Sequence, residues 1–160
     1  GGVSGPHLHF EIRDENQKTI NPFITGLSIK DAISPIINSV ALIPFNRNSY
    51  VNGISEETIF KVKKINDSEF ILMDTINING SVGIALNTHD RITNQEFNFG
   101  IHAIELYQDD QLIYSMKYDN MKWADSNKLY TEKNYSLATL DKKKKVFPCL
   151  LDQKNRAILD

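Results

Sequence analysis

Short runs rich in isoleucine, valine, phenylalanine and tyrosine recur along the chain, separated by asparagine, aspartate and glycine. Runs of this length and composition are typical of β-strands. We expect strands at residues 8–13, 36–45, 57–65, 69–73, 82–88, 100–107 and 111–118. Because helical periodicity is poor almost throughout, this spacing predicts an all-β protein whose strands pack as a sandwich.

Two pairs of segments have the pattern of β-hairpins. In the first, residues 100–107 and 111–118 alternate between apolar and polar positions on either side of a turn at Asp109 and Asp110. In the second, residues 146–151 and 156–159 flank a polar stretch. Residues 121–129, between the two hairpins, suit a short helix with Trp123 as a packing residue.

The strictest alternation lies at the beginning, in the segment GPHLHFEIR that ends at Arg13. Successive side chains of a strand point to opposite faces, so one face carries His7, His9, Glu11 and Arg13. The other face carries Leu8, Phe10 and Ile12. Burial of those three would contribute on the order of 2 kcal/mol each. It would hold the two imidazoles about 7 Å apart and aimed the same way.

This pair of histidines is the main candidate for chemistry. Neutral imidazole is a common zinc ligand and also moves protons near neutral pH, so two rings on one face can serve one small site. The spacing alone leaves a second interpretation open, in which both are ordinary solvent-facing strand residues. Glu11 and Arg13 are expected to form an exposed ion pair rather than to take part in catalysis.

Residues 1–27 resemble the C-terminal end of the lysostaphin or LytM-type zinc endopeptidase domain. The resemblance lies in SGPHLHFEIR, from Ser4 to Arg13, followed by INPF from Ile20 to Phe23. It implies that His9 binds zinc and that His7 is a catalytic histidine. The implied substrate is a peptide in bacterial peptidoglycan. A zinc ion with three protein ligands and an open position lowers the pKa of its water to about 7 and polarises the scissile carbonyl.

The chain departs from the family pattern in two ways. Val3 stands where a hydroxyl residue is often found. In the family, the other ligands, in a His-x-x-x-Asp arrangement, and a further catalytic histidine precede this motif, so we expect the chain to be a fragment. The remaining histidines, His89 and His102, lack ligand-like spacing; His89 should end a strand and His102 should face outward. The 160 residues alone are therefore not expected to hydrolyse peptide bonds.

Three regions are expected. Residues 1–30 form the final strands of the peptidase β-domain, and residues 31–120 form an accessory antiparallel sandwich. The general layout of this sandwich resembles the immunoglobulin-like modules appended to some envelope peptidases. Residues 121–160 hold the short helix and the second hairpin, and the start of a further domain is one interpretation of them.

Composition narrows the classes of partner. The chain has 160 residues, 18 Lys and Arg against 20 Asp and Glu, a net charge of −2, and 41% hydrophobic residues. This balance argues against a nucleic-acid interface, and the lysines at 142–145 suit a solvated loop. The single cysteine, Cys149, cannot form an internal disulfide and suits a buried thiol. No apolar run is long enough for a membrane-spanning helix.

Two functions remain open at this point. In the first, the parent protein is a zinc-dependent peptidoglycan endopeptidase of the periplasm or cell envelope, and its partners are peptidoglycan peptides. In the second, the parent is a non-catalytic scaffold or regulator that binds another cell-wall enzyme. The presence of both His7 and His9 favours the first, because a degenerate site has no chemical reason to keep the pair.

Overall fold

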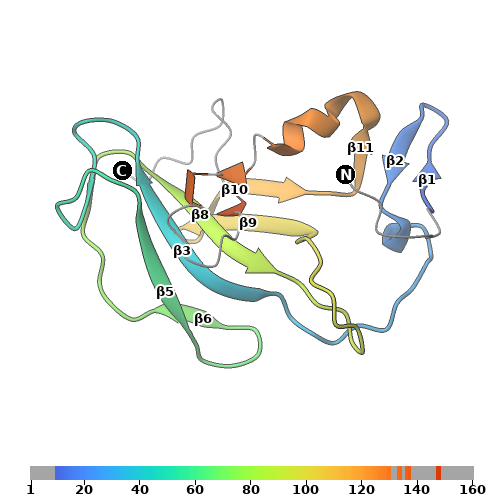
Figure 1. The fold of residues 1–160 in the computed structure, drawn as a ribbon, viewed down its shortest axis with the longest axis horizontal. Helices are drawn as coiled ribbons and strands as arrows, with labels where there is room; N and C mark the ends of the chain where they lie inside the picture. Colours follow the sequence, from blue (N-terminus) through green and yellow to red (C-terminus); the bar gives the residue numbers. More distant parts are fainter. Residues whose placement is uncertain (1–9, 131–132, 135, 138–146, 149–160) are drawn as a thin grey trace.

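The structure is a computed structural model that describes residues 10–130, 133–134, 136–137 and 147–148. Across these residues, the elements with defined bounds are antiparallel β-strands and two 3-10 helices, which confirms the all-β prediction (Figure 1). The strands are β1 (Ile12–Arg13), β2 (Lys18–Ile20), β3 (Ile36–Pro44), β4 (Tyr50–Val51), β5 (Thr58–Lys64), β6 (Phe70–Leu72), β7 (Ile78–Asn79), β8 (Val82–His89), β9 (Ala103–Gln108), β10 (Gln111–Lys117), β11 (Asn120–Lys122), β12 (Lys133–Asn134) and β13 (Phe147–Pro148). The 3-10 helices are η1 (Pro22–Ile24) and η2 (Trp123–Tyr130).

The largest sheet has the strand order β6-β5-β3-β8, and β3 pairs with both of its neighbours. Apolar side chains on both faces of β3 explain why its sequence is a nearly continuous apolar run. On one face, Ala41 and Ala85 are completely buried against Leu137. On the other, Leu42 packs with Val51 and Val82. The core of the protein therefore lies on both sides of this strand.

The β9–β10 hairpin has the predicted turn. Gln108 and Gln111 pair directly, which leaves Asp109 and Asp110 as a two-residue loop. Both aspartates have positive φ angles, 48° and 65°, as a type I′ turn requires. The predicted strands from 36 to 118 are confirmed, with ends shifted by up to three residues. The finer prediction of an immunoglobulin-like arrangement is consistent with these sheets and stays a prediction.

The segment expected to be a helix from residue 121 begins instead as a strand. Residues 120–122 form β11, and the helical part starts at Trp123 as the 3-10 helix η2. The cause is the free edge of β2, where Met121 pairs with Thr19 and the Thr19 hydroxyl donates to the Met121 carbonyl at 2.9 Å. Trp123 is 67% exposed, so its predicted packing role is wrong.

The first strand differs from its prediction as well. Only Ile12 and Arg13 of residues 10–13 are in a strand, and Phe10 is 62% exposed rather than buried. Among the described residues, no side chain of the small sheet β1-β2-β11 belongs to the buried clusters around β3, and Ile12 is only partly buried. Leu8 lies outside the described residues.

The sheet β1-β2-β11 joins parts of the chain that are far apart in sequence. Ile20 of β2 pairs with Asn120 of β11, and the backbone N–H of Asn21 also donates to the Asp119 carbonyl at 2.8 Å. Figure 1 shows this small sheet beside the end of the β9–β10 hairpin. The proposed boundaries at residues 30 and 120 stay a prediction, and this pairing crosses both of them.

Several sequence predictions fall beyond the described ranges. Cys149 and the lysine run at 142–145 lie outside them. Of the second predicted hairpin, only Phe147 and Pro148 are described, and they form β13, which pairs with β12. Among the described helices, none combines the length and apolar character needed to cross a membrane.

Candidate functional site

The predicted zinc residues, His7 and His9, lie outside the described residues, whereas the next two members of their face lie inside. Arg13 donates from Nε and Nη2 to Glu11 Oε1 at 2.9 and 2.6 Å. The two side chains therefore lie on the same face, as the alternation predicts, and their expected exposed ion pair is confirmed.

A tight turn connects β1 to β2 and fixes the register of this hairpin. Asp14 Oδ1 accepts hydrogen bonds from the backbone amides of Asn16 and Lys18, at 2.9 and 2.8 Å. Gln17 has a positive φ angle of 60° within the turn. Arg13 consequently pairs with Thr19, and Ile12 with Ile20.

The INPF segment after β2 forms a capped helical turn. Asn21 is the N-cap residue of η1, and its Oδ1 accepts from the Phe23 amide at 3.1 Å. Pro22 occupies the first turn, where its missing N–H costs nothing. The Asn21 side chain also donates from Nδ2 to the Tyr118 carbonyl at 3.4 Å. This part of the motif therefore anchors the hairpin to the segment between β10 and β11.

The two other histidines lie where the sequence predicted. His89 ends β8, and its Nδ1 is 3.2 Å from Asn38 Nδ2. His102 is exposed and bonds through Nε2 to Asp119 Oδ1 at 2.8 Å. Within the described ranges, no group of three or more histidine, cysteine, aspartate or glutamate side chains could hold a metal ion. The zinc assignment of His7 and His9 stays a prediction.

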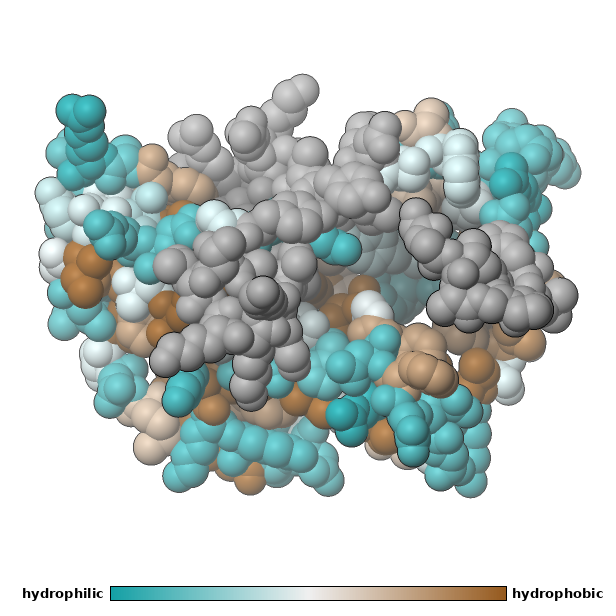
Figure 2. Space-filling model, in the orientation of Figure 1, coloured by the Kyte–Doolittle hydropathy of each residue, from teal (hydrophilic) through white to brown (hydrophobic). Residues whose placement is uncertain are grey.

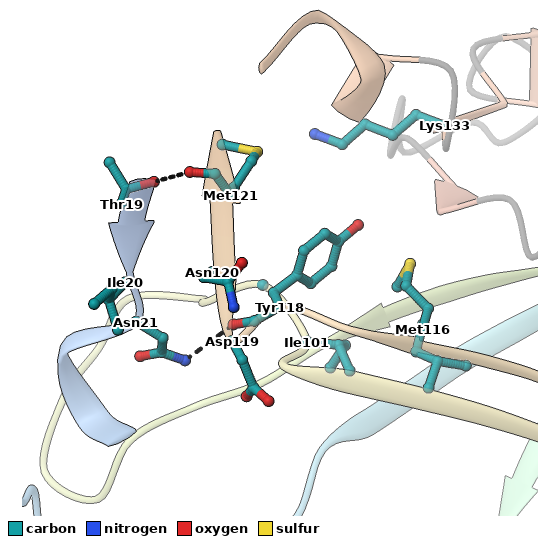
Figure 3. Close-up of a pocket in the computed structure, with 12 residues that line it drawn as sticks. Thr19, Ile20, Asn21, Ile101, Met116, Tyr118, Asp119, Asn120, Met121 and Lys133 are labelled. Atoms are coloured by element: carbon teal, nitrogen blue, oxygen red, sulfur yellow. Dashed lines mark hydrogen bonds between the residues drawn. The ribbon is translucent and has the colours of Figure 1, made fainter. Parts of the chain in front are cut away.

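A cavity of about 430 Å³ lies between the small sheet and the β9–β10 hairpin (Figure 3). Its apolar lining comes from Ile20, Ile101, Ile104, Met116, Tyr118 and Met121. Its polar lining comes from Thr19, Asn21, Asp119, Asn120 and Lys133. Sequence reasoning missed this cavity, because strand patterns predict which face is apolar but not which distant strands meet.

A lysine and a histidine hold the carboxylate of Asp119 at the edge of this cavity. Lys117 Nζ donates to Oδ2 at 2.8 Å, and His102 Nε2 lies 2.8 Å from Oδ1. The hydrogen bond from Lys117, followed by that from His102, lowers the pKa of Asp119 below its ordinary value. In Figure 3 the carboxylate points away from the space between Tyr118 and Lys133.

Lys117→Gln should raise the pKa of Asp119 toward its ordinary value, because it removes the larger of the two stabilising hydrogen bonds. A carboxyl group with a lowered pKa stabilises the fold above its unfolded pKa of about 3.9, and this contribution is lost as the pH falls through the folded pKa. The loss of stability on acidification below about pH 4 should therefore be smaller in the variant, which lacks part of this contribution at higher pH. A carboxyl ¹³C titration measures the pKa directly. Lys122→Gln is the control, and equal Asp119 pKa values in the two variants would refute the assignment.

A second cavity, of about 580 Å³, lies between the connector after η1 and the loop before β9. Asp31 ties these segments together, since its Oδ1 accepts from the amides of Ile33 and Thr93 at 3.1 and 3.2 Å. The same hydrogen bonds, the one from Ile33 first, lower the pKa of Asp31.

Apolar side chains are also exposed near this connector. In η1, which precedes it, Phe23 and Ile24 are half exposed. Figure 2 shows that apolar residues reach the visible face at several places between hydrophilic ones.

Comparison with protein-family models, with curated proteins and with solved structures found no match to the chain.

Proposed function

We propose that the chain is part of a zinc-dependent endopeptidase that hydrolyses peptide bonds in peptidoglycan, in the periplasm or cell envelope. The observation that supports the proposal is the pairing of Glu11 with Arg13, which places both side chains on one side of the segment that leads into β1. Two and four residues before Glu11, the same alternation reaches His9 and His7.

Each residue of this face has a role in the proposal. His9 would supply a neutral nitrogen ligand to zinc, and His7 would hold or transfer a proton beside it. Zinc, when bound, polarises a carbonyl group and lowers the pKa of water to about 7. The Glu11–Arg13 pair lies at the start of β1, where its exposed charges orient each other. The turn at Asp14 and the cap at Asn21 hold the strand in position.

The other ligands would have to come from residues outside this motif. Since zinc affinity depends on several deprotonated donors placed together, the 160 residues alone should bind zinc poorly and should not cleave peptidoglycan. The proposal therefore concerns the longer protein that carries this chain.

The test is muropeptide release from cross-linked peptidoglycan by that longer protein. We expect release that stops when a chelator removes the metal and returns when zinc is added back. The 160-residue chain, incubated with zinc in parallel, should release none. If the longer protein binds no zinc and releases nothing, but captures a peptidoglycan hydrolase, the scaffold function is supported and the proposed activity is refuted.

A further inference from the structure

We infer that the 430 Å³ cavity between the small sheet and the β9–β10 hairpin binds the free carboxyl end of a short peptide with small apolar side chains. The peptidoglycan stem as the source of this peptide rests on the proposed function. The inference depends on three features: the charge at the cavity, its apolar wall, and its position relative to the first strand.

Lys133 supplies the charge. Figure 3 shows its ammonium group directed into the space bounded by Met121, Tyr118 and Met116. Across the described ranges, Lys133 forms no side-chain hydrogen bond or ion pair. Among the described residues, the one acidic residue that lines the cavity is Asp119, and its two carboxylate oxygens are bonded to His102 and Lys117. The uncompensated charge at the cavity is therefore positive and suits an anionic group.

The other polar groups of the lining are largely occupied within the protein. The Thr19 hydroxyl donates to the Met121 carbonyl, and the side-chain amide of Asn21 donates from Nδ2 to the Tyr118 carbonyl. A ligand would therefore meet one cation, the Asn120 side chain and an apolar wall of isoleucine, methionine and tyrosine side chains. A volume of about 430 Å³ lies at the small end of the range for ligand pockets, roughly 300–1,000 Å³. This combination fits a small molecule with a carboxylate at one end and methyl groups along its body.

The position of the cavity points to a peptide. Ile20, in the cavity wall, pairs directly with Ile12 of β1, the strand that continues the predicted catalytic face. The cavity is therefore one strand away from β1, the strand into which the predicted catalytic segment leads. A stem peptide ending in D-alanine has the required carboxylate and small apolar side chains.

The binding test uses the methionine methyl groups of the full chain. The chain has three methionines. Met116 and Met121 line the cavity, whereas Met73 is 61% exposed beside β6 and serves as an internal control. Titration with N-acetyl-D-alanyl-D-alanine should shift the NMR signals of Met116 and Met121 and leave that of Met73 unchanged.

Two comparisons decide which group is recognised. The C-terminal amide of the same dipeptide should bind at least about tenfold more weakly, because a charge-assisted hydrogen bond is lost. Lys133→Gln should weaken binding of the acid by about the same factor and leave the amide unaffected, whereas Lys122→Gln, on the adjacent β11, should change neither. Two further compounds test other sources of the carboxylate. The L-alanyl dipeptide represents a protein C-terminus, and hexanoate represents a fatty acid.

The inference is overturned if acid and amide bind equally, if Lys133→Gln has no effect, or if the methionine signals do not move. Tighter binding of the L-dipeptide or of hexanoate would also overturn it, because the ligand would then be of another class. If the dipeptide does not bind in the cavity but the longer protein releases muropeptides in a zinc-dependent way, only the cavity assignment is refuted. If the dipeptide binds but the longer protein releases no muropeptides, only the proposed activity is refuted.

Discussion

Leu137→Ala is expected to destabilise the protein by about 2–5 kcal/mol, the range for removing a fully buried leucine side chain. Leu137 has no exposed surface and packs against Ala41 and Ala85. Those neighbours are small and belong to the paired strands β3 and β8, so they cannot move to fill the space. A urea titration should show a lower midpoint with an unchanged slope, because the same surface is exposed on unfolding.

Leu112→Ala is the matched control for this substitution. Leu112 lies on β10 and is 48% exposed, so the same change should cost far less. If the two variants unfold at the same urea concentration, Leu137 does not pack as the structure describes. A Leu137→Met variant, which keeps the volume, should recover most of the lost stability.

His7→Ala and His9→Ala should separate two roles in the longer protein. His9→Ala should lose bound zinc and, with it, peptidoglycan cleavage, since a ligand is removed. His7→Ala should keep its zinc while its turnover falls by about 10²–10⁴-fold, the usual contribution of a general acid or base. Metal analysis by mass spectrometry and the rate of muropeptide release measure the two effects independently.

His102→Ala is the control for both histidine variants. This histidine is exposed on the β9–β10 side of the molecule and is bonded to Asp119, so its loss should change neither zinc content nor cleavage. Equal zinc loss in the His7 and His9 variants would contradict the division of roles. Full activity in both would refute the proposed site altogether.

The strand pattern was predictable from sequence wherever one strand pairs with its neighbour along the chain. Residues 103–117 fold as the expected hairpin because Asp109 and Asp110 tolerate the positive φ angles of a two-residue turn. β3 was predictable from its apolar run. Both depend on local residue preferences, which a sequence displays directly.

Features that depend on distant segments were not predictable. Met121 and Lys122 have no strong strand signal, and they become a strand because β2 offers them an unpaired edge. Phe10 was expected inside because its neighbours alternate, but alternation does not reveal whether a core exists to receive that face. The cavity and the Asp119 cluster likewise combine residues from β2, β10, β11 and β12.

For the candidate site, the sequence identified residue types and a shared face. The structure describes only the pair at Glu11 and Arg13, so the placement of His7 and His9 stays a prediction. Lys133 escaped notice because nothing in its local sequence separates it from the other lysines. Its significance arises only from where β12 places it relative to Met116 and Met121.

The pairing of β2 with β11 has a consequence for how the protein assembles. Joining Ile20 to Asn120 closes a loop of roughly 100 residues, which costs on the order of 4 kcal/mol in chain entropy if the loop is still unstructured. The cost falls once the intervening strands have formed and brought the two ends together. On the ribosome, the β1–β2 hairpin must therefore wait, with one edge open to solvent or to a chaperone, until the residues of β11 have emerged.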